Sequence, residues 1–311
     1  MGNNRLINLI RKNSLETNIF YTGIFLLASA PSISSVMIFF AGVISSIKNK
    51  SYFKDYWNIP FFFSGLLIFF SCISNSFRVN LFAIPEYEIN LLWLGIVNWI
   101  PYFWAFWALQ NYSNNPIKRK IISLLLLFGS LPVILTGFFQ YFFKIHGPFT
   151  LFGGLITWYS RPILNYDGMS GLFNNANYTG TWLNIIWPIA LILFIEGKNR
   201  FYQKVISLLF LISTATCLIL TYSRNAWLIF LISSIIILGY KSLKWIIPIL
   251  IVIASAVLLS IGTIENSYLI NLSRNIVPEL IWNYRFSTFS LENFSSFGRI
   301  EIWDTAIKLI I

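Results

Sequence analysis

Three short segments of this 311-residue chain combine residue types that can bind an anion. Residues 171–178 read Gly-Leu-Phe-Asn-Asn-Ala-Asn-Tyr and precede a long apolar run. Residues 221–227 read Thr-Tyr-Ser-Arg-Asn-Ala-Trp and form a short turn between two apolar runs, and residues 299–303 begin an amphipathic segment. Unpaired N–H groups at a helix start, combined with arginine guanidinium groups, bind phosphate oxygens well. The three segments are therefore candidates for a phosphate-binding site.

The asparagines of the first segment have two interpretations. An asparagine that precedes a helix caps it by accepting a backbone hydrogen bond. Capping needs one residue and this segment has three, so Asn174 and Asn177 are also candidates for shaping a binding pocket. The sequence leaves both interpretations open.

The arginines have the same ambiguity. Arg224 is expected at a helix start, where the helix macrodipole disfavours a cation by about 0.3–1 kcal/mol unless an anion is bound. The alternative is that Arg224 reaches toward lipid headgroups. Arg299 is either a second phosphate ligand or a surface charge beside Glu301.

The composition of the chain predicts an all-α integral membrane protein. Hydrophobic residues make up 57% of the chain and charged residues only 11%, whereas soluble domains carry about 25% charged residues. The net charge of +11 lies on loops beside apolar runs and not in a basic domain. We therefore expect membrane lipids, and not nucleic acid, as partners.

The apolar runs predict about nine transmembrane helices. They cover residues 19–30, 33–47, 60–77, 91–110, 121–143, 179–196, 205–222, 226–240 and 245–263. The first two are short and flank Pro31, so they form either one kinked span or a hairpin. With a hairpin, the loops on one side hold 14 basic and three acidic residues, and those on the other side hold eight of each. The positive-inside rule therefore favours the hairpin and a cytoplasmic N-terminus. Pro31 directly follows the possible cleavage site at residues 28–30 and disfavours cleavage, so we expect an uncleaved first helix.

Two segments on the external side are long. Residues 144–178 are rich in glycine and proline, so we expect an ordered loop that buries its aromatic residues: Phe149, Phe152, Trp158 and Tyr159. Residues 1–263 then form the transmembrane domain, and residues 264–311 begin a large external loop. The last amphipathic segment stops without a cap, which suggests a C-terminally truncated chain.

Together, the three segments resemble motifs of the O-antigen ligase and polymerase superfamily, which are bacterial membrane glycosyltransferases. A G-x-F-x-N-P-N-type element, an S-R-G/N-A-type turn and an R-x-x-I/W-type helix occur there in this order. Residues 93–101 and residues 132–141 also look like its cyanobacterial-type branch. Ala176 stands where the family usually has proline.

The resemblance implies a type-C glycosyltransferase-like fold in the bacterial inner membrane. It implies transfer of a glycan from an undecaprenyl-diphosphate carrier to lipid A-core or to a growing polysaccharide, at the periplasmic face. Arg224, Arg299 and Arg161 are then expected to hold the diphosphate, and Asn174 and Asn177 to shape the donor pocket. No cofactor and no metal is expected, and the catalytic residue is unassigned.

Two other hypotheses about the function stay open. The family's loop continues to a histidine motif that this chain lacks, and we give its role to no other residue, including His146, so the chain could be an inactive fragment. A transporter of a small anion such as bicarbonate is the other alternative. It should carry ionisable residues at mid-membrane depth, and the spans 60–77, 91–110, 121–143, 205–222 and 245–263 contain none. Ligase and polymerase activity are not distinguished.

Overall fold

The computed structural model describes residues 14–48, 52–82, 89–164, 167–196, 201–262, 266–277 and 298–310, with the single positions 279 and 281. The chain divides into two compact units. The first comprises residues 1–132 and 149–157, and the second comprises residues 133–148 and 158–311.

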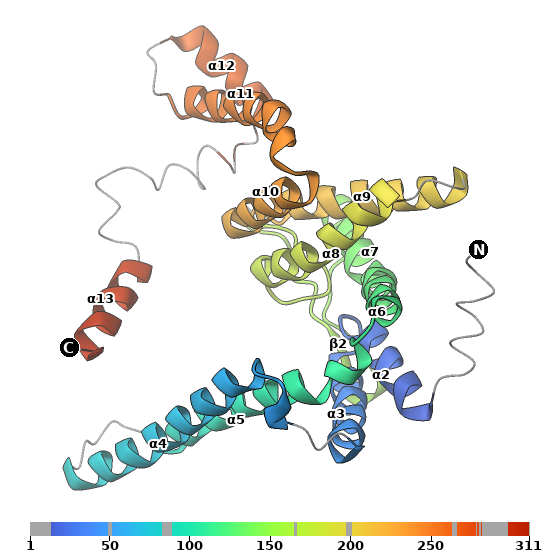
Figure 1. Cartoon of the computed structure of the whole chain (residues 1–311). Coiled ribbons are helices and arrows are strands. Elements are labelled where there is room, and N and C mark those ends of the chain that lie inside the picture. The colour runs from blue at the N-terminus through green and yellow to red at the C-terminus, as the bar shows by residue number, and fades with distance from the viewer. Residues whose placement is uncertain are drawn as a thin grey trace. The chain divides into compact units, whose positions relative to one another are not determined.

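The first unit is built mainly from helices. They are α2 (Leu15–Leu26), α3 (Pro31–Lys48), η1 (Tyr52–Lys54), α4 (Asn58–Phe82), α5 (Ile89–Ala108), η2 (Gln110–Tyr112) and α6 (Pro116–Gly129). A short strand pair follows later in the chain, with β1 (Phe149–Leu151) joined through η3 (Phe152–Gly154) to β2 (Ile156–Trp158). Figure 1 shows α4 and α5 running side by side.

The first two apolar runs form a hairpin of separate helices, as the loop charges predicted. Pro31 begins α3, where its missing N–H group costs no hydrogen bond. The two helices approach closely, because Ser34 Oγ donates a hydrogen bond of 2.7 Å to the Gly23 carbonyl. A Cβ on Gly23 would lie 2.8 Å from Ile38 Cγ1. Glycine is therefore needed at this crossing.

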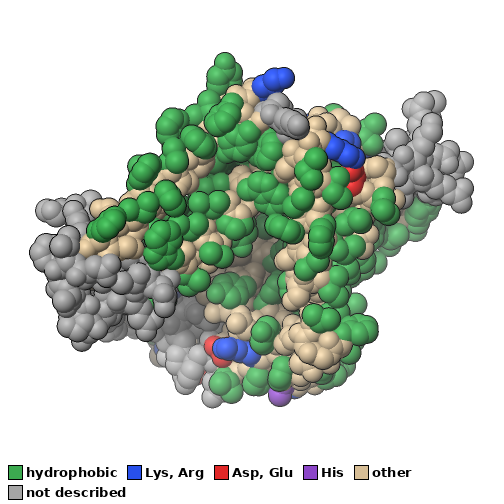
Figure 2. Space-filling view, turned by 90° about the horizontal axis from the view of Figure 1, so that it is seen from below, with side chains coloured by type: hydrophobic (Ala, Val, Ile, Leu, Met, Phe, Trp, Pro, Cys, Tyr) green, Lys and Arg blue, Asp and Glu red, His purple; other side chains and the backbone are tan. Residues whose placement is uncertain are grey.

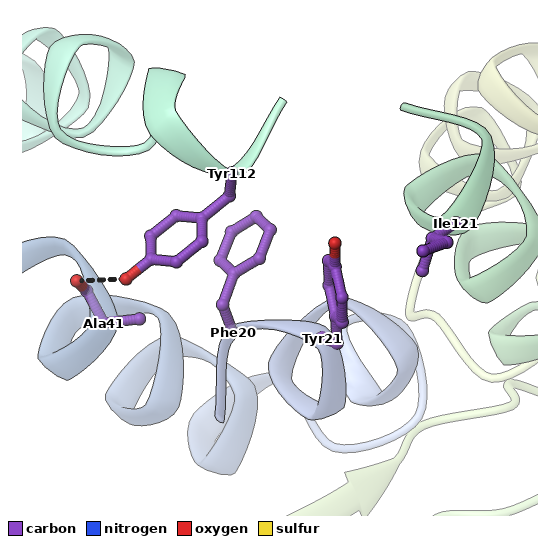
Figure 3. Close-up of a cluster of buried hydrophobic side chains, with 5 residues drawn as sticks. All are labelled: Phe20, Tyr21, Ala41, Tyr112 and Ile121. Carbon is purple, nitrogen blue, oxygen red and sulfur yellow. Dashed lines mark hydrogen bonds between the residues drawn. The ribbon is translucent and has the colours of Figure 1, made fainter. Parts of the chain in front are cut away.

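An aromatic cluster joins this hairpin to the segment before α6 (Figure 3). The rings of Phe20 and Tyr112 stack with centroids 4.3 Å apart and planes 14° apart. Tyr112 Oη donates to the Ala41 carbonyl at 3.0 Å. Tyr21 and Ile121 complete the buried cluster. It fixes η2 against α2 and α3.

The second unit contains the remaining helices. They are α7 (Leu131–Phe143), α8 (Ala176–Glu196), α9 (Phe201–Leu220), α10 (Arg224–Leu238), η4 (Tyr240–Ser242), α11 (Leu243–Ile261), α12 (Ser267–Ile276) and α13 (Gly298–Ile310). Helix α8 packs against both α9 and α10. Trp187 Nε1 donates to Ser234 Oγ at 2.9 Å, and Asn184 Nδ2 donates to the Ala226 carbonyl at 3.2 Å. These bonds fix the register of α8 against α10.

The structure is that of an all-α membrane protein. Among the described residues, six segments are long and apolar enough to cross a membrane: Pro31–Lys48, Asn58–Phe77, Pro116–Phe143, Ala176–Glu196, Phe201–Leu220 and Tyr240–Ile261. The other three predicted spans fall on α2, α5 and α10, of which α2 and α10 have only 12 and 15 residues. Figure 2 shows a face on which hydrophobic side chains predominate and charged ones are few, as expected for contact with lipid.

Candidate functional site

The turn between α9 and α10 carries the second motif. Helix α9 ends at Leu220, Tyr222 adopts a φ of 49°, and α10 begins at Arg224. Ser223 occupies the N-cap position, but its side chain makes no capping bond. Its Oγ instead donates to Asn177 Oδ1 at 2.8 Å. This bond joins the 171–178 and 221–227 motifs.

The asparagines of the first motif divide their roles. Asn175 Oδ1 accepts a hydrogen bond of 2.8 Å from the Asn177 N–H group, at the start of α8. This is the local side-chain-to-backbone turn that asparagine commonly forms. Asn175 thus accounts for the capping interpretation, and the side chain of Asn177 is used for the contact with Ser223.

The loop before α8 is held by one buried glutamine. Gln140, on α7, is 2% exposed. Its Oε1 accepts from the N–H groups of Ser170 and Gly171, each at 2.9 Å. Its Nε2 donates to Ser170 Oγ at 2.8 Å and to the Arg161 carbonyl. All four hydrogen-bonding positions of the amide group are used, so this loop has a defined backbone path.

The same loop also contacts the α9–α10 turn. The Met169 N–H group donates to the Leu220 carbonyl at 2.9 Å. A Cβ on Gly168 would lie 1.8 Å from the Thr221 carbonyl oxygen, so only glycine allows this approach. Thr179 Oγ1 donates to the Ser170 carbonyl, which connects the loop to α8 as well.

These contacts enclose a polar cavity of about 200 Å³. It is lined by Gln140, Arg161, Pro162, Asp167, Gly168, Ser170, Asn174, Asn175, Ala176, Asn177 and Thr221. Three of the predicted site residues line this one cavity: Arg161, Asn174 and Asn177. The lining has one cationic and one anionic side chain and is otherwise rich in amide and hydroxyl groups. Such a cavity can bind phosphate oxygens at Arg161 and sugar hydroxyls at the amides.

The other two predicted arginines lie elsewhere. Arg224 is partly buried and follows Ser223 directly, at the first residue of α10, but it does not line the cavity. Arg299 lies in α13, and its side chain is outside the described residues. The predicted pairing of Arg224 with Arg299 therefore stays a prediction.

A tyrosine pair beside the cavity was not foreseen from the sequence. Tyr141 and Tyr222 place their hydroxyl oxygens 3.0 Å apart. Burial raises the pKa of Tyr222, and the contact with Tyr141 raises it further. The neutral phenol therefore persists under ordinary conditions and holds the strained turn in place. Gln140 was detectable, because a polar residue in an apolar membrane segment is a functional candidate.

The buried residues of the loop 144–178 differ from those that the sequence predicted. Phe149, Phe152 and Tyr159 are 42%, 75% and 51% exposed, so the prediction that they are buried is wrong. Met169 and Leu172 are the buried hydrophobic residues of the loop, at 0% and 3% exposure. They are the residues that lie against the helices, because the Gln140 contacts draw this part of the loop inward.

Metal-ligating groups and known relatives add no further assignment. The described residues include no group of three or more histidine, cysteine, aspartate or glutamate side chains that could hold a metal ion. No protein-family model, curated protein or solved structure matches the chain. The geometry of the site and its motifs are consequently the features that point to a function.

Proposed function

We propose that this protein is an O-antigen ligase or polymerase-like glycosyltransferase of the bacterial inner membrane, with its N-terminus in the cytoplasm. It transfers a glycan from an undecaprenyl-diphosphate carrier to lipid A-core or to a growing polysaccharide at the periplasmic face. The observation that carries the proposal is the bond between Ser223 and Asn177 beside the polar cavity. It joins two motifs whose order suggested this class of enzyme.

The cavity residues suit the two groups that the breaking bond joins, the sugar and the diphosphate. In the transfer, an acceptor hydroxyl oxygen bonds to the anomeric carbon and gives up its proton to the released diphosphate or to water, and the bond from that carbon to the diphosphate oxygen breaks. Negative charge grows on the diphosphate, where a positioned guanidinium group stabilises it. Arg161 is placed in the cavity for this role, and Arg224 is the proposed second ligand from the adjoining turn. Asn174 and Asn177 hydrogen-bond the sugar.

The position of the site favours surface chemistry over anion transport. The cavity lies where α8 begins and α9 ends. The charged residues of the six candidate spans lie at or near the span ends, such as Lys48, Glu196 and Lys204. A transporter should instead have ionisable groups near mid-span.

The direct test is glycan transfer in membranes that contain the full-length protein and a lipid-diphosphate glycan donor. Arg161→Gln removes the guanidinium group from the cavity while leaving the backbone carbonyl that Gln140 binds. We expect roughly a tenfold to hundredfold loss of transfer, because hydrogen bonds to charged groups contribute about 1.5–3 kcal/mol. The matched control is Lys308→Gln, which removes an exposed positive charge from α13.

Three outcomes separate the possibilities. Loss of transfer in Arg161→Gln, with Lys308→Gln active, supports the proposal. Transfer by the full-length protein but none by residues 1–311 would favour the inactive fragment. Bicarbonate uptake that requires Arg161, without any transfer, would favour the transporter.

A further inference from the structure

A second cavity lies in the first unit, at one end of its helices. Its volume is about 440 Å³, and it is lined by Asp55, Trp57, Phe106, Gln110, Asn111, Ser113 and Asn114. Helices α3 and α5 end near it, and α4 and α6 begin near it. The ends of membrane-spanning helices lie at the boundary between hydrocarbon and water. The cavity is therefore placed at the level of lipid headgroups.

Buried hydrogen bonds between helices fix the walls of this cavity. Asn58 is fully buried, and its Nδ2 donates to the Tyr52 carbonyl at 2.8 Å. Gln110 Nε2 donates to Asn58 Oδ1 at 3.2 Å, and Asn111 Nδ2 donates to Ser45 Oγ at 3.2 Å. The segments 52–58 and 110–114 are thus held together before any ligand binds.

The two walls differ in charge. On the wall formed by the segment 52–58, Asp55 Oδ1 accepts a hydrogen bond from the Trp57 N–H group at 3.0 Å. The other wall is formed by the segment 110–114. Lys118 Nζ donates to its Asn111 carbonyl at 2.7 Å, and Arg119 donates to its Ser113 carbonyl at 3.1 Å. Neither ion pair in the described part of the chain involves these charged groups. The Asp55 carboxylate thus lines the cavity, and the two cations lie outside the lining but are bonded to the backbone of two lining residues.

We propose that this cavity binds the headgroup of a phospholipid that carries both an ammonium group and a phosphate, as phosphatidylethanolamine does. The ammonium group pairs with the Asp55 carboxylate and the face of the Trp57 ring. The phosphate pairs with Lys118 and Arg119. A headgroup without an ammonium group leaves Asp55 facing a ligand of its own charge, which disfavours it.

Exposed aromatic side chains beside the cavity favour a lipid over a soluble ligand. Phe53, Tyr56 and Trp57 are 64%, 82% and 75% exposed. Aromatic residues of this kind gather at the membrane interface, with their rings at headgroup level. A lipid held here would have its acyl chains beside apolar helix surface. This site is independent of the proposed glycan transfer.

The test is lipid binding to the detergent-solubilised full chain, measured by native mass spectrometry. Phosphatidylethanolamine and phosphatidylglycerol with identical acyl chains are titrated separately. We expect wild-type protein to bind phosphatidylethanolamine about tenfold more tightly, as one charge-assisted hydrogen bond predicts. Asp55→Asn should abolish the preference and preserve the fold, because the asparagine oxygen still accepts from the Trp57 N–H group. Asp304→Asn, at an exposed carboxylate of α13, is the matched control.

Two further measurements complete the design. Lys118→Gln should weaken binding of both lipids, because both carry the phosphate. Soluble phosphoethanolamine should compete poorly, because it lacks acyl chains. Equal affinity of the wild type for both lipids, a preference that survives in Asp55→Asn, undiminished binding in Lys118→Gln, or efficient competition by soluble phosphoethanolamine would each overturn the proposal.

Discussion

Replacing Gln140 with methionine should destabilise the second unit strongly. The two side chains have similar volume, so the change mainly removes hydrogen bonds. The N–H groups of Ser170 and Gly171, both in the buried part of the loop, would lose their acceptor. Each unsatisfied buried group costs about 1–3 kcal/mol, so we expect a loss of about 2–6 kcal/mol.

The assay is thermal unfolding of the detergent-solubilised protein. A loss of this size corresponds to a fall in melting temperature of roughly 4–12 °C, at about 2 °C per kcal/mol for a chain of this length. The matched control is Gln203→Met, the same change at an exposed position on α9. Gln140→Glu keeps the acceptor for both N–H groups but cannot donate to the Arg161 carbonyl, so its melting temperature should lie between those of the wild type and Gln140→Met.

Melting temperatures of Gln140→Met and Gln203→Met within about 2 °C of each other would contradict this expectation, since about 1 kcal/mol produces a shift of that size. That result would mean that the loop finds other partners, or that water satisfies the two N–H groups.

Three further predictions concern other parts of the chain. Arg224→Lys should lower glycan transfer by roughly tenfold to a hundredfold at normal abundance, because lysine lacks the guanidinium fork; full activity would favour lipid-headgroup contact instead. Burial, and then the charge of Glu16, raise the pKa of Tyr112 to about 12. The folded state therefore holds this proton more tightly than the unfolded state does. The stability of the wild type should fall relative to that of Tyr112→Phe as the pH rises above about 10. Denaturation of both proteins at about pH 9 and about pH 11 measures the difference. The cysteine in Asn115→Cys should react with a membrane-impermeant maleimide only when the cytoplasmic side is accessible. Labelling in intact cells would place residue 115 outside and contradict the predicted topology.

The helices were largely predictable because they depend on local composition. Apolar runs of the right length predicted the long helices, and Pro31 marked the break between α2 and α3. The run at 121–143 was predicted as one helix, but α6 ends at Gly129 and α7 begins at Leu131. Pro132 explains the break, since in a continuous helix proline has no N–H group to donate to the carbonyl four residues earlier, at Phe128, and its ring clashes with that carbonyl.

The site was predictable only in part because its contacts are not local. The 171–178 motif identified Asn177, and the family resemblance added Arg161; both residues line the cavity. The partner of Ser223 was not predictable, because a serine before a helix usually caps it and here the partner lies in another helix. Gln140 makes contacts with residues 21, 30 and 31 positions away. No pattern within the α7 segment encodes those partners.

The contacts of the cavity loop have a consequence for the order in which the protein matures. Ser223 follows Asn177 by 46 positions, and Met169 is bonded to Leu220. A ribosome therefore delivers the loop to the membrane before it has made the turn that the loop binds. Until α9 has been inserted, the Met169 N–H group lacks its acceptor at Leu220, and Gly168 lacks the Thr221 backbone that it contacts. The cavity is thus a late product of biogenesis, and a protease present during synthesis should cut this loop in nascent chains that stop before α9 but spare it in completed ones.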